Sequence, residues 1–470
     1  MNKKFKFLPV ARLRSAGRLL RTGLLPVALL LLTLNLHAQQ PASSAAGTPQ
    51  LHQFSLAQAI DYASKNSVAV KNALLDYEIQ EQSNRATVSQ ALPQVTGSLA
   101  ATYYTQFPAT AVPGGSFPGT TPGKVYAFSF GLPSTNTASV SLKQVLFDGQ
   151  VFVGLQARQT SLDFYRKRQE ITEQIIRVNI NKVYYQLLVG KFQLDQIDAN
   201  IHSQEELLHN SSEMFKNGFA EQLDVDKATV QLSNLQTDRI QTEYNISYGY
   251  LGLKVLLGMP IRDSLALTDT LTYDMVRDAV LGDDYKYADR REFQLLEINR
   301  RLNEYDIKRY KKQYIPTASL QATYQQQQYW FHIDPFQRAT WFPGSWIGLN
   351  INIPIFDGFY KDANIKQAQL KLRQTENNQD SLKIRIDNDV RDAQLRFNAA
   401  LATLDYQKKN MELSEKVYAQ TRKKYEQGLG SNIEITNAFS DQRTAQANYF
   451  NALYNAIAAK VDYLNAIGKL

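Results

Sequence analysis

The sequence predicts a mainly α-helical fold with a smaller β part, built from two copies of one half. An internal repeat is the first observation: Phe147-Asp148-Gly149 recurs as Phe356-Asp357-Gly358, 209 residues later. Proline placement is the second, since no proline lies between Pro133 and Pro260 or after Pro354. The third is the spacing of apolar residues, which recur every seven residues in the proline-free stretches and every second residue around the prolines. Long coiled-coil helices and short strands follow from these patterns.

Residues 1–38 are expected to be a secretory signal peptide and not part of the fold. Seven basic residues and no acids accompany the apolar run Leu24–Leu36, and His37-Ala38 offers a small-residue cleavage site. A membrane-anchored N-terminus is the alternative, although the run is short for a span of about 20 residues. No later stretch reaches 18 consecutive apolar residues, so no transmembrane helix is expected after the leader.

Charge and cysteine content exclude several classes of protein. The leader holds seven of the 52 Lys and Arg residues, which leaves 45 against 44 Asp and Glu in the mature chain. This near-neutral balance gives no case for nucleic-acid binding. The chain has no cysteine, which excludes disulfides, thiolate metal sites and a lipid-anchored N-terminal cysteine.

The two copies are expected at residues 39–260 and 285–470, with 261–284 connecting them. Helical patterns at about Leu56–Ala91 and Arg290–Tyr314 each end before a proline and are followed by alternating residues. Strands are expected at about 94–105 and 137–147 in the first copy, and at about 317–329 and 345–355 in the second. The segments Gln106–Asn136 and Gln325–Ser345 between the strands look like exposed hairpin loops.

Each copy ends in a pair of long helices. They are expected at about 150–216 and 221–258, then at about 358–426 and 432–468, because an apolar heptad recurs in the same phase in both copies. A strict seven-residue repeat predicts left-handed coiled-coil packing. The heptad residues of the two copies are Ile180, Leu187, Leu194, Ile201, Leu208 and Phe215, and Val390, Phe397, Leu404, Met411, Tyr418 and Tyr425. The last helix adds an alanine stripe at Ala438, Ala445, Ala452, Ala459 and Ala466.

Alternation alone does not say which face of the strands meets water, because a soluble β-sandwich also buries one apolar face. Four strands cannot close a barrel, and lipid cannot satisfy open strand edges. A membrane location therefore requires several copies of the chain. Aromatic residues near the strand ends fit an interfacial girdle, and the faces of Ser, Thr, Asn and Gln suit a water-filled lumen.

These residues resemble the TolC-like outer membrane efflux (channel-tunnel) family over nearly all of the mature chain. The resemblance rests on Val145–Gly149 and Ile353–Gly358, where strand passes into long helix. It rests equally on two hairpin patterns, Met214–Gly218 with Leu223-Asp224-Val225 and Lys424–Gly428 with Ile433-Glu434-Ile435. Each motif is loose alone, but the duplicated order behind a signal peptide is specific.

The resemblance implies a passive trimeric exit duct and no catalysis. Each protomer would give four strands to one 12-stranded β-barrel in outer-membrane lipid, and the long helices would form a periplasmic tunnel. The implied system is tripartite efflux or type I secretion of small molecules or peptides. Its other partners would be a periplasmic membrane-fusion adaptor protein and an inner-membrane pump of the RND, ABC or MFS type. No cofactor is expected, and the sequence names no cargo.

The two hairpin turns are the candidate adaptor-contact site. The family contacts its adaptor, and opens and closes, at this periplasmic tip, so the resemblance assigns adaptor contact to Asn217, Gly218 and Phe219 and to Gln427, Gly428, Leu429, Gly430 and Ser431. Glycine at a tight turn between helices also has a structural reason, because it accepts a positive φ.

Acids beyond each tip are candidates for an entrance constriction. Asp224 and Glu434 lie six residues after the tip glycines, and Lys227 and Asn437 lie nine residues after them. The family often narrows its entrance with acids here, and the second acid is absent in both copies. An acid in the first turn of a helix also complements the helix dipole, and both interpretations stay open.

The strand-to-helix hinges at Asp148, Gly149, Asp357 and Gly358 are expected to be structural, with Asp capping the helix and Gly allowing the bend. Signals for an enzyme are weak, since no phosphate loop, Rossmann glycine run or nucleophile elbow occurs. His202 and His209 are seven residues apart and lack the spacing of helical metal ligands. The alternative function is a periplasmic coiled-coil adaptor or scaffold that links the two membranes.

Overall fold

The computed structural model describes residues 50–107, 109–129, 131–271, 276, 285–331 and 340–470. The expected signal peptide, residues 1–38, lies outside them, as does most of the later part of the connecting segment. Residues 51–470 form one compact unit. The first copy contains β1 (Leu51–Phe54), α2 (Leu56–Asn66), α3 (Val68–Ser89), β2 (Gln94–Tyr103), β3 (Ala109–Pro113), β4 (Val125–Ser129), β5 (Ser134–Phe147), α4 (Gly149–Lys216) and α5 (Gln222–Leu257). The rest contains β6 (Ser264–Leu267), a 3₁₀ turn at Tyr287–Asp289, α7 (Arg291–Lys312), β7 (Thr317–Trp330), β8 (Phe342–Asn352), α8 (Tyr360–Glu426) and α9 (Asn432–Ala466).

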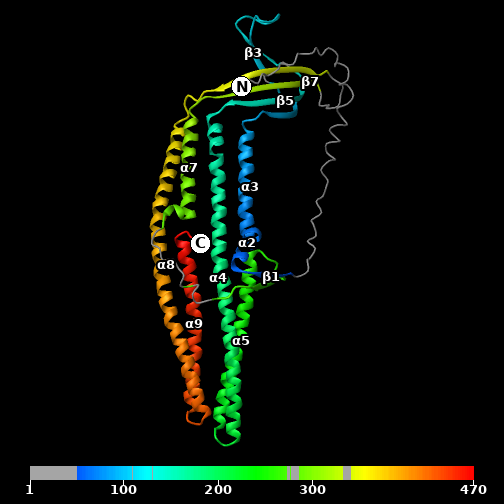
Figure 1. The fold of residues 1–470 in the computed structure, drawn as a ribbon. Helices are drawn as coiled ribbons and strands as arrows, with labels where there is room; N and C mark the ends of the chain where they lie inside the picture. Colours follow the sequence, from blue (N-terminus) through cyan, green and yellow to red (C-terminus); the bar gives the residue numbers. More distant parts are fainter. Residues whose placement is uncertain (1–49, 108, 130, 272–275, 277–284, 332–339) are drawn as a thin grey trace, which may run out of the picture. The chain divides into compact units, whose positions relative to one another are not determined.

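Two very long helices organise the fold. Helices α4 and α8 have 68 and 67 residues, which is about 100 Å each at about 1.5 Å per residue. Figure 1 shows α3 and then α5 running along α4, and α7 and then α9 running along α8. Helix α4 also packs against α7 and α9. Each copy therefore packs shorter helices along one long helix, which are α2, α3 and α5 on α4 and α7 and α9 on α8.

The heptad of the second copy is the better buried of the two. Phe397 and Leu404 are fully buried on α8, and Tyr418 and Tyr425 are nearly so. In the first copy Ile180 and Leu187 are buried, but Phe215 is 41% exposed. Four of the five alanines of the α9 stripe are buried, at positions 438, 445, 452 and 466. The repeat thus marks the coiled-coil seam in both copies, with unequal packing.

Four strands form one antiparallel sheet in the order β2-β5-β7-β8. The strands join the helices directly, since β5 continues into α4 and β8 is followed by α8 (Figure 1). Strands β3 and β4 form a separate hairpin within the expected loop Gln106–Asn136. The other expected loop, Gln325–Ser345, lies partly outside the described residues.

Three elements differ from the sequence expectation in ways that have a local cause or divide a helix. The strand expected at about 345–355 is β8 and ends at Asn352, because Pro354 has no N–H to donate to a neighbouring strand. The helix expected from 358 begins at Tyr360, after Phe359 adopts a left-handed conformation with φ 68°. The pattern expected as one helix at Leu56–Ala91 is two helices, α2 and α3, which meet at Ser67.

A short parallel pair, β1 with β6, ties the start of the described chain to the connecting segment. Tyr184 of α4 donates its hydroxyl to the carbonyl oxygen of Phe54 at 3.0 Å, and burial raises the pKa of Tyr184. Asp269 accepts a hydrogen bond from the N–H of Leu56 at 2.8 Å, which satisfies a free donor at the start of α2. Sequence patterns gave no sign of this pairing, which couples residues more than 200 positions apart.

Candidate functional site

The two helix-hairpin tips have the same backbone geometry. Gly218 and Gly428 adopt φ +81° and +71°. At the first tip the N–H of Phe219 donates to the carbonyl of Met214 at 2.8 Å, and at the second the N–H of Leu429 donates to that of Lys424 at 2.9 Å. This pattern is a Schellman turn, which needs a left-handed residue after the helix. Glycine at both tips therefore has a conformational cause.

The tips also expose large apolar side chains at equivalent positions. Phe219 and Leu429, 210 residues apart in the repeat, are 80% and 77% exposed. Leu223 and Ile433, also 210 residues apart, are 54% and 63% exposed. Asn217 caps the end of α4, and its side chain donates to the carbonyl of Glu213 at 2.8 Å. Gln427 caps the end of α8, and Gly430 and Ser431 complete the turn before α9.

The candidate constriction residues lie in the first turns of α5 and α9. Asp224 accepts a hydrogen bond from the N–H of Glu221, the N-cap residue of α5, at 3.3 Å. At the equivalent position of the second tip Ser431 is the N-cap, and its hydroxyl accepts from the N–H of Glu434 at 3.2 Å. Asn437 and the carboxylate-bearing Glu434 are exposed. A capping role is therefore visible for Asp224 and Ser431.

The strand-to-helix hinges use their glycines differently. Gly358 has φ +64°, whereas Gly149 has no positive φ and a Cβ there would lie 2.9 Å from the Cβ of Lys312 on α7. Asp148 caps α4 by accepting from the N–H of Gln150 at 2.8 Å. Asp357 does not occupy the N-cap position of α8, but it accepts from the N–H of Lys361 at 3.1 Å.

A polar seam joins the two hairpins between the tips and the middle of the long helices. We use this name for the side chains of α4, α8 and α9 that meet there. Arg422 of α8 donates to Ser203 at 2.9 Å and to Glu206 at 2.7 Å, both on α4. Other contacts of the seam are Asn200 to Gln446 at 2.8 Å, Ser211 with Tyr425 at 3.3 Å and Ser203 with Tyr418 at 3.5 Å.

Sequence reasoning missed the polar seam. Tyr418 and Tyr425 were counted only as apolar members of the heptad, although their hydroxyls contact α4 serines. A signal was present in the sequence: the same heptad position is Phe397 and Leu404 in the middle of α8 and becomes Tyr418 and Tyr425 toward the tip. Asn200, Gln204 and Ser211 lie at core positions of α4 and are at most 6% exposed.

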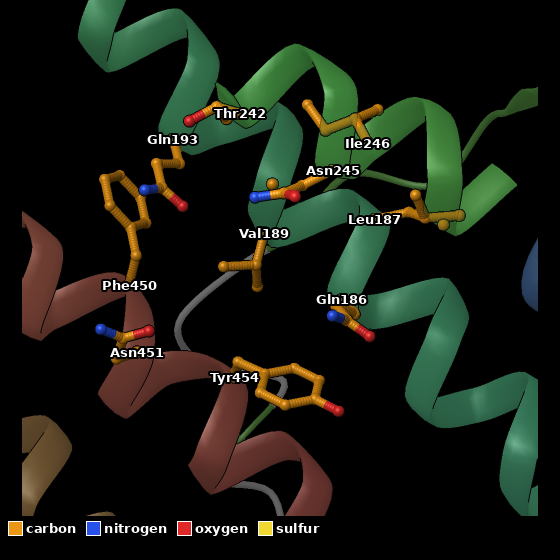
Figure 2. Close-up of a pocket in the computed structure, with 12 residues that line it drawn as sticks. Gln186, Leu187, Val189, Gln193, Thr242, Asn245, Ile246, Phe450, Asn451 and Tyr454 are labelled. Carbon is orange, nitrogen blue, oxygen red and sulfur yellow. The ribbon is translucent and has the colours of Figure 1, made fainter. Parts of the chain in front are cut away.

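A groove lies beside the seam where α4 runs between α5 and α9. One pocket in this groove has a volume of about 280 Å³. Figure 2 shows Val189 of α4 facing this space, with Asn245 of α5 and Tyr454 of α9 beside it. Amide and apolar side chains line this pocket, and none of its lining residues is Asp, Glu, Lys, Arg or His.

The four-stranded sheet has one polar and one apolar face. Along one row of paired residues lie Thr96, Ser141, Thr323 and Trp346, and along the next lie Val95, Leu142, Ala322 and Ile347. Alternate residues of a strand point to opposite faces. Apolar side chains of the second face are bare in the single chain: Val95, Leu99, Ile347, Leu349 and Ile351 are 56–87% exposed.

The described residues contain no group of three or more His, Asp or Glu side chains that could hold a metal ion. His202 forms a 3.4 Å contact with Glu206 on the same helix and is well exposed. Of the helices that the structure describes, none is long and apolar enough to cross a membrane.

Comparison with known proteins points to one family. A family model described as outer membrane efflux protein matches residues 288–469. Outer membrane protein TolC of Vibrio cholerae serotype O1 is 19% identical over 340 residues, which covers 71% of this chain and 77% of that protein.

Solved structures of channels share the fold. The structure of CusC, described as undergoing transmembrane channel formation, matches with a TM-score of 0.70 at 15% identity and covers 88% of this chain and 91% of CusC. The CmeC outer membrane channel of Campylobacter jejuni matches with a TM-score of 0.66 at 16% identity, over 88% of this chain and 85% of CmeC. The long-helix hairpins with a small β part are therefore a channel-tunnel fold.

Proposed function

Because the chain belongs to the TolC-like outer membrane efflux proteins, we propose that three copies of it form one passive duct across the periplasm and outer membrane. The protein is an outer-membrane efflux channel with a long periplasmic part. The family is one of channels and not a class of enzymes. The proposal adds the trimer, its partners and the residues that act at each end.

One observation carries the trimer: the sheet has a bare apolar face and two edge strands, β2 and β8, with no partner strand among the described residues. In lipid, unpaired backbone N–H and C=O groups are costly, so a membrane sheet must close on itself. Four strands are too few to do so, whereas twelve from three chains form a barrel with room for a channel. The apolar face then meets lipid and the polar face meets water.

The alternative of a periplasmic adaptor is not favoured. A soluble adaptor would leave side chains such as Leu99 and Ile347, which are 87% and 79% exposed, in water with no covering element. The family match and the channel structures agree with the duct.

We further propose that the two tips bind a periplasmic adaptor, which in turn joins an inner-membrane pump. Support comes from the exposed pair Phe219 and Leu429, since large exposed apolar side chains at a protein surface often mark interaction sites. The turn residues Asn217, Gly218, Gln427, Gly428, Gly430 and Ser431 would position this pair. At the same end, Asp224, Glu434 and Asn437 would line the entrance, with Asp224 also capping α5.

Disulfide trapping tests the trimer. The chain has no natural cysteine, so only the introduced cysteines can form a crosslink between copies. Ser98→Cys on β2 is combined in turn with Asn350→Cys or Asn352→Cys on β8, which face away from the apolar side. Under oxidation in outer membranes we expect covalent dimers and trimers. Ser139→Cys with Gln325→Cys is the matched control, because these residues lie opposite each other on β5 and β7 of one chain and should leave a monomer.

Membrane fractionation gives a second test of the duct, and one of its outcomes would contradict the proposal. A heat-modifiable oligomer in the outer membrane is expected. A monomer in the soluble or inner-membrane fraction, with no β2–β8 crosslink in either variant, would exclude the duct.

Ion conductance tests the entrance. Single channels of Glu434→Gln and Asp224→Asn should lose part of their cation preference if these carboxylates narrow the entrance. Unchanged selectivity and closure in both variants would leave the two acids with only their roles at the helix starts.

A further inference from the structure

The four-stranded sheet contains a single side chain that is charged at neutral pH. Strands β2, β7 and β8 have no Asp, Glu, Lys or Arg, and β5 has only Lys143. In a chain with 52 basic and 44 acidic residues, a single charged side chain among the 49 residues of these four strands sets the sheet apart.

Strand register places Lys143 on the polar face. Its row across the sheet is Gln94, Lys143, Gln321 and Gly348. The neighbouring row along the strands, through Leu142, points to the opposite, apolar face. Lys143 is exposed, and no ion pair among the described residues includes it.

This position has a physical consequence in a closed barrel. A lysine that faces lipid is strongly unfavourable, so the face that carries Lys143 must be the one in contact with water. Building on the proposed duct, we propose that Lys143 determines the ion preference of the barrel. Three copies place three ammonium groups around one water-filled lumen, four residues before each β5 ends at Phe147, and this ring favours anionic over cationic solutes.

Nearby acids do not cancel this charge within the sheet. Beyond the end of β5, Asp148 accepts a helix N–H, and Asp357 is paired with Lys361 at 3.2 Å. The tip acids Asp224 and Glu434 lie at the other end of the long helices, about 100 Å away along α4. Since the Debye length is about 10 Å at 0.1 M salt, the two ends of the duct act on ions independently.

Reversal potentials in planar bilayers test this inference. The wild-type duct, Lys143→Gln and Lys143→Glu are compared in a KCl gradient centred near 0.1 M. Lys143→Gln should lower the chloride-to-potassium permeability ratio by about twofold or more, and Lys143→Glu should lower it further. The effect should fade near 1 M salt, where the Debye length is about 3 Å.

Lys124→Gln is the matched control. Lys124 lies next to β4 in the β3–β4 hairpin, outside the four-stranded sheet, so its removal should leave the ratio unchanged. Gln at 143 matches its neighbours Gln94 and Gln321 in shape and polarity, and a heat-modifiable oligomer checks that each variant assembles.

The outcomes separate this inference from the proposed function. A conducting wild-type channel whose permeability ratio is the same in Lys143→Gln and Lys143→Glu overturns the role of Lys143 and leaves the duct intact. A wild-type protein that inserts but never conducts overturns the duct itself.

Discussion

At the residue scale, the repeat preserves glycines that serve different physical needs. Gly218 at the first tip has φ +81°, and a Cβ there would meet nothing within 4 Å. Gly258, which ends α5, has φ +70°, and a Cβ there would lie 2.3 Å from the carbonyl oxygen of Asn66. Gly218 is needed only for its backbone conformation. Gly258 is needed for its conformation and also because α5 comes close to the break between α2 and α3.

Alanine substitutions should separate these two needs. Gly218→Ala should cost about 1 kcal/mol, the strain of a left-handed non-glycine residue. Gly258→Ala should cost roughly 1–3 kcal/mol more, because backbone atoms must move. The measurement is the denaturant or thermal midpoint of the detergent-solubilised oligomer. Equal losses for the two variants would show that the contact with Asn66 is relieved without strain.

At the element scale, the two long helices share a heptad repeat, but equivalent apolar side chains are buried to different extents in the two copies. Leu194 of α4 and Leu404 of α8 are equivalent positions of the repeat, 210 residues apart. Leu404 is fully buried against α9, whereas Leu194 is only partly buried. Removing apolar atoms costs free energy in proportion to their burial and to the cavity that remains.

Leu404→Ala should therefore destabilise the protein by about 2–5 kcal/mol. Leu194→Ala is the matched control in the first copy and should cost clearly less. Unfolding of both variants in the same detergent gives the comparison. A larger loss for Leu194→Ala would mean that assembly of several chains buries that position more deeply than the single chain does.

The bridge between Arg422 of α8 and Glu206 of α4 is an interaction between elements that depends on pH. Hydrogen bonding from Arg422, and then its charge, lower the pKa of Glu206. A carboxyl whose pKa is lowered in the folded state stabilises that state above its ordinary pKa of about 4.3, and this contribution is lost as pH falls through the lowered value.

Hydrogen exchange of Ser203–Ser211 should therefore be slow at pH 7 and, after correction for intrinsic rates, faster below about pH 4. Glu206→Gln should exchange faster already at pH 7 and change less with pH. His202→Gln is the control for the neighbouring histidine, which lies 3.4 Å from the same carboxyl and lowers its pKa less than Arg422 does. Its exchange profile should change less than that of Glu206→Gln.

At the scale of the whole molecule, the tips and one face of the sheet are two of the surfaces where a single chain exposes large apolar side chains. In the proposed duct, the apolar sheet face would meet lipid, the sheet edges would meet other copies of the chain, and the tips would meet a different partner. If Phe219 and Leu429 contact an adaptor, they should matter for capture of that protein and not for assembly of the duct.

The double variant Phe219→Ser with Leu429→Ser should still form a heat-modifiable oligomer but should lose crosslinks to the adaptor and export. Lys423→Ser, one turn before the second tip, is the control and should keep both. Photo-crosslinking from the tips in intact cells is the measurement. Retention of the full crosslink by the double variant would contradict adaptor contact through these side chains.

Much of this architecture could be predicted from sequence because its signals are long or repeated. Helices of more than 60 residues need an absence of proline over the same length, and four alternating strands each follow or precede a turn. The pairing of β1 with β6 could not be predicted, since LHQF and SLAL are four-residue strands whose paired residues lie 213 positions apart. The break at Ser67 carries neither proline nor glycine, and the polar seam was hidden because tyrosine serves equally as an apolar and a hydrogen-bonding residue.

The polar seam has a consequence for how the hairpins can separate. Near the tips, parting α4 from α8 and α9 would uncover amides and hydroxyls such as Asn200, Ser211 and Gln446, whose lost hydrogen bonds water can replace. Nearer the middle of the chain, the same movement would uncover Leu404 and Leu453, which water cannot solvate favourably. Apolar side chains such as Leu207 of α4 and Phe439 of α9 share a buried cluster near the tips as well, so the polar contacts lower but do not remove the cost of parting the hairpins from the tip end.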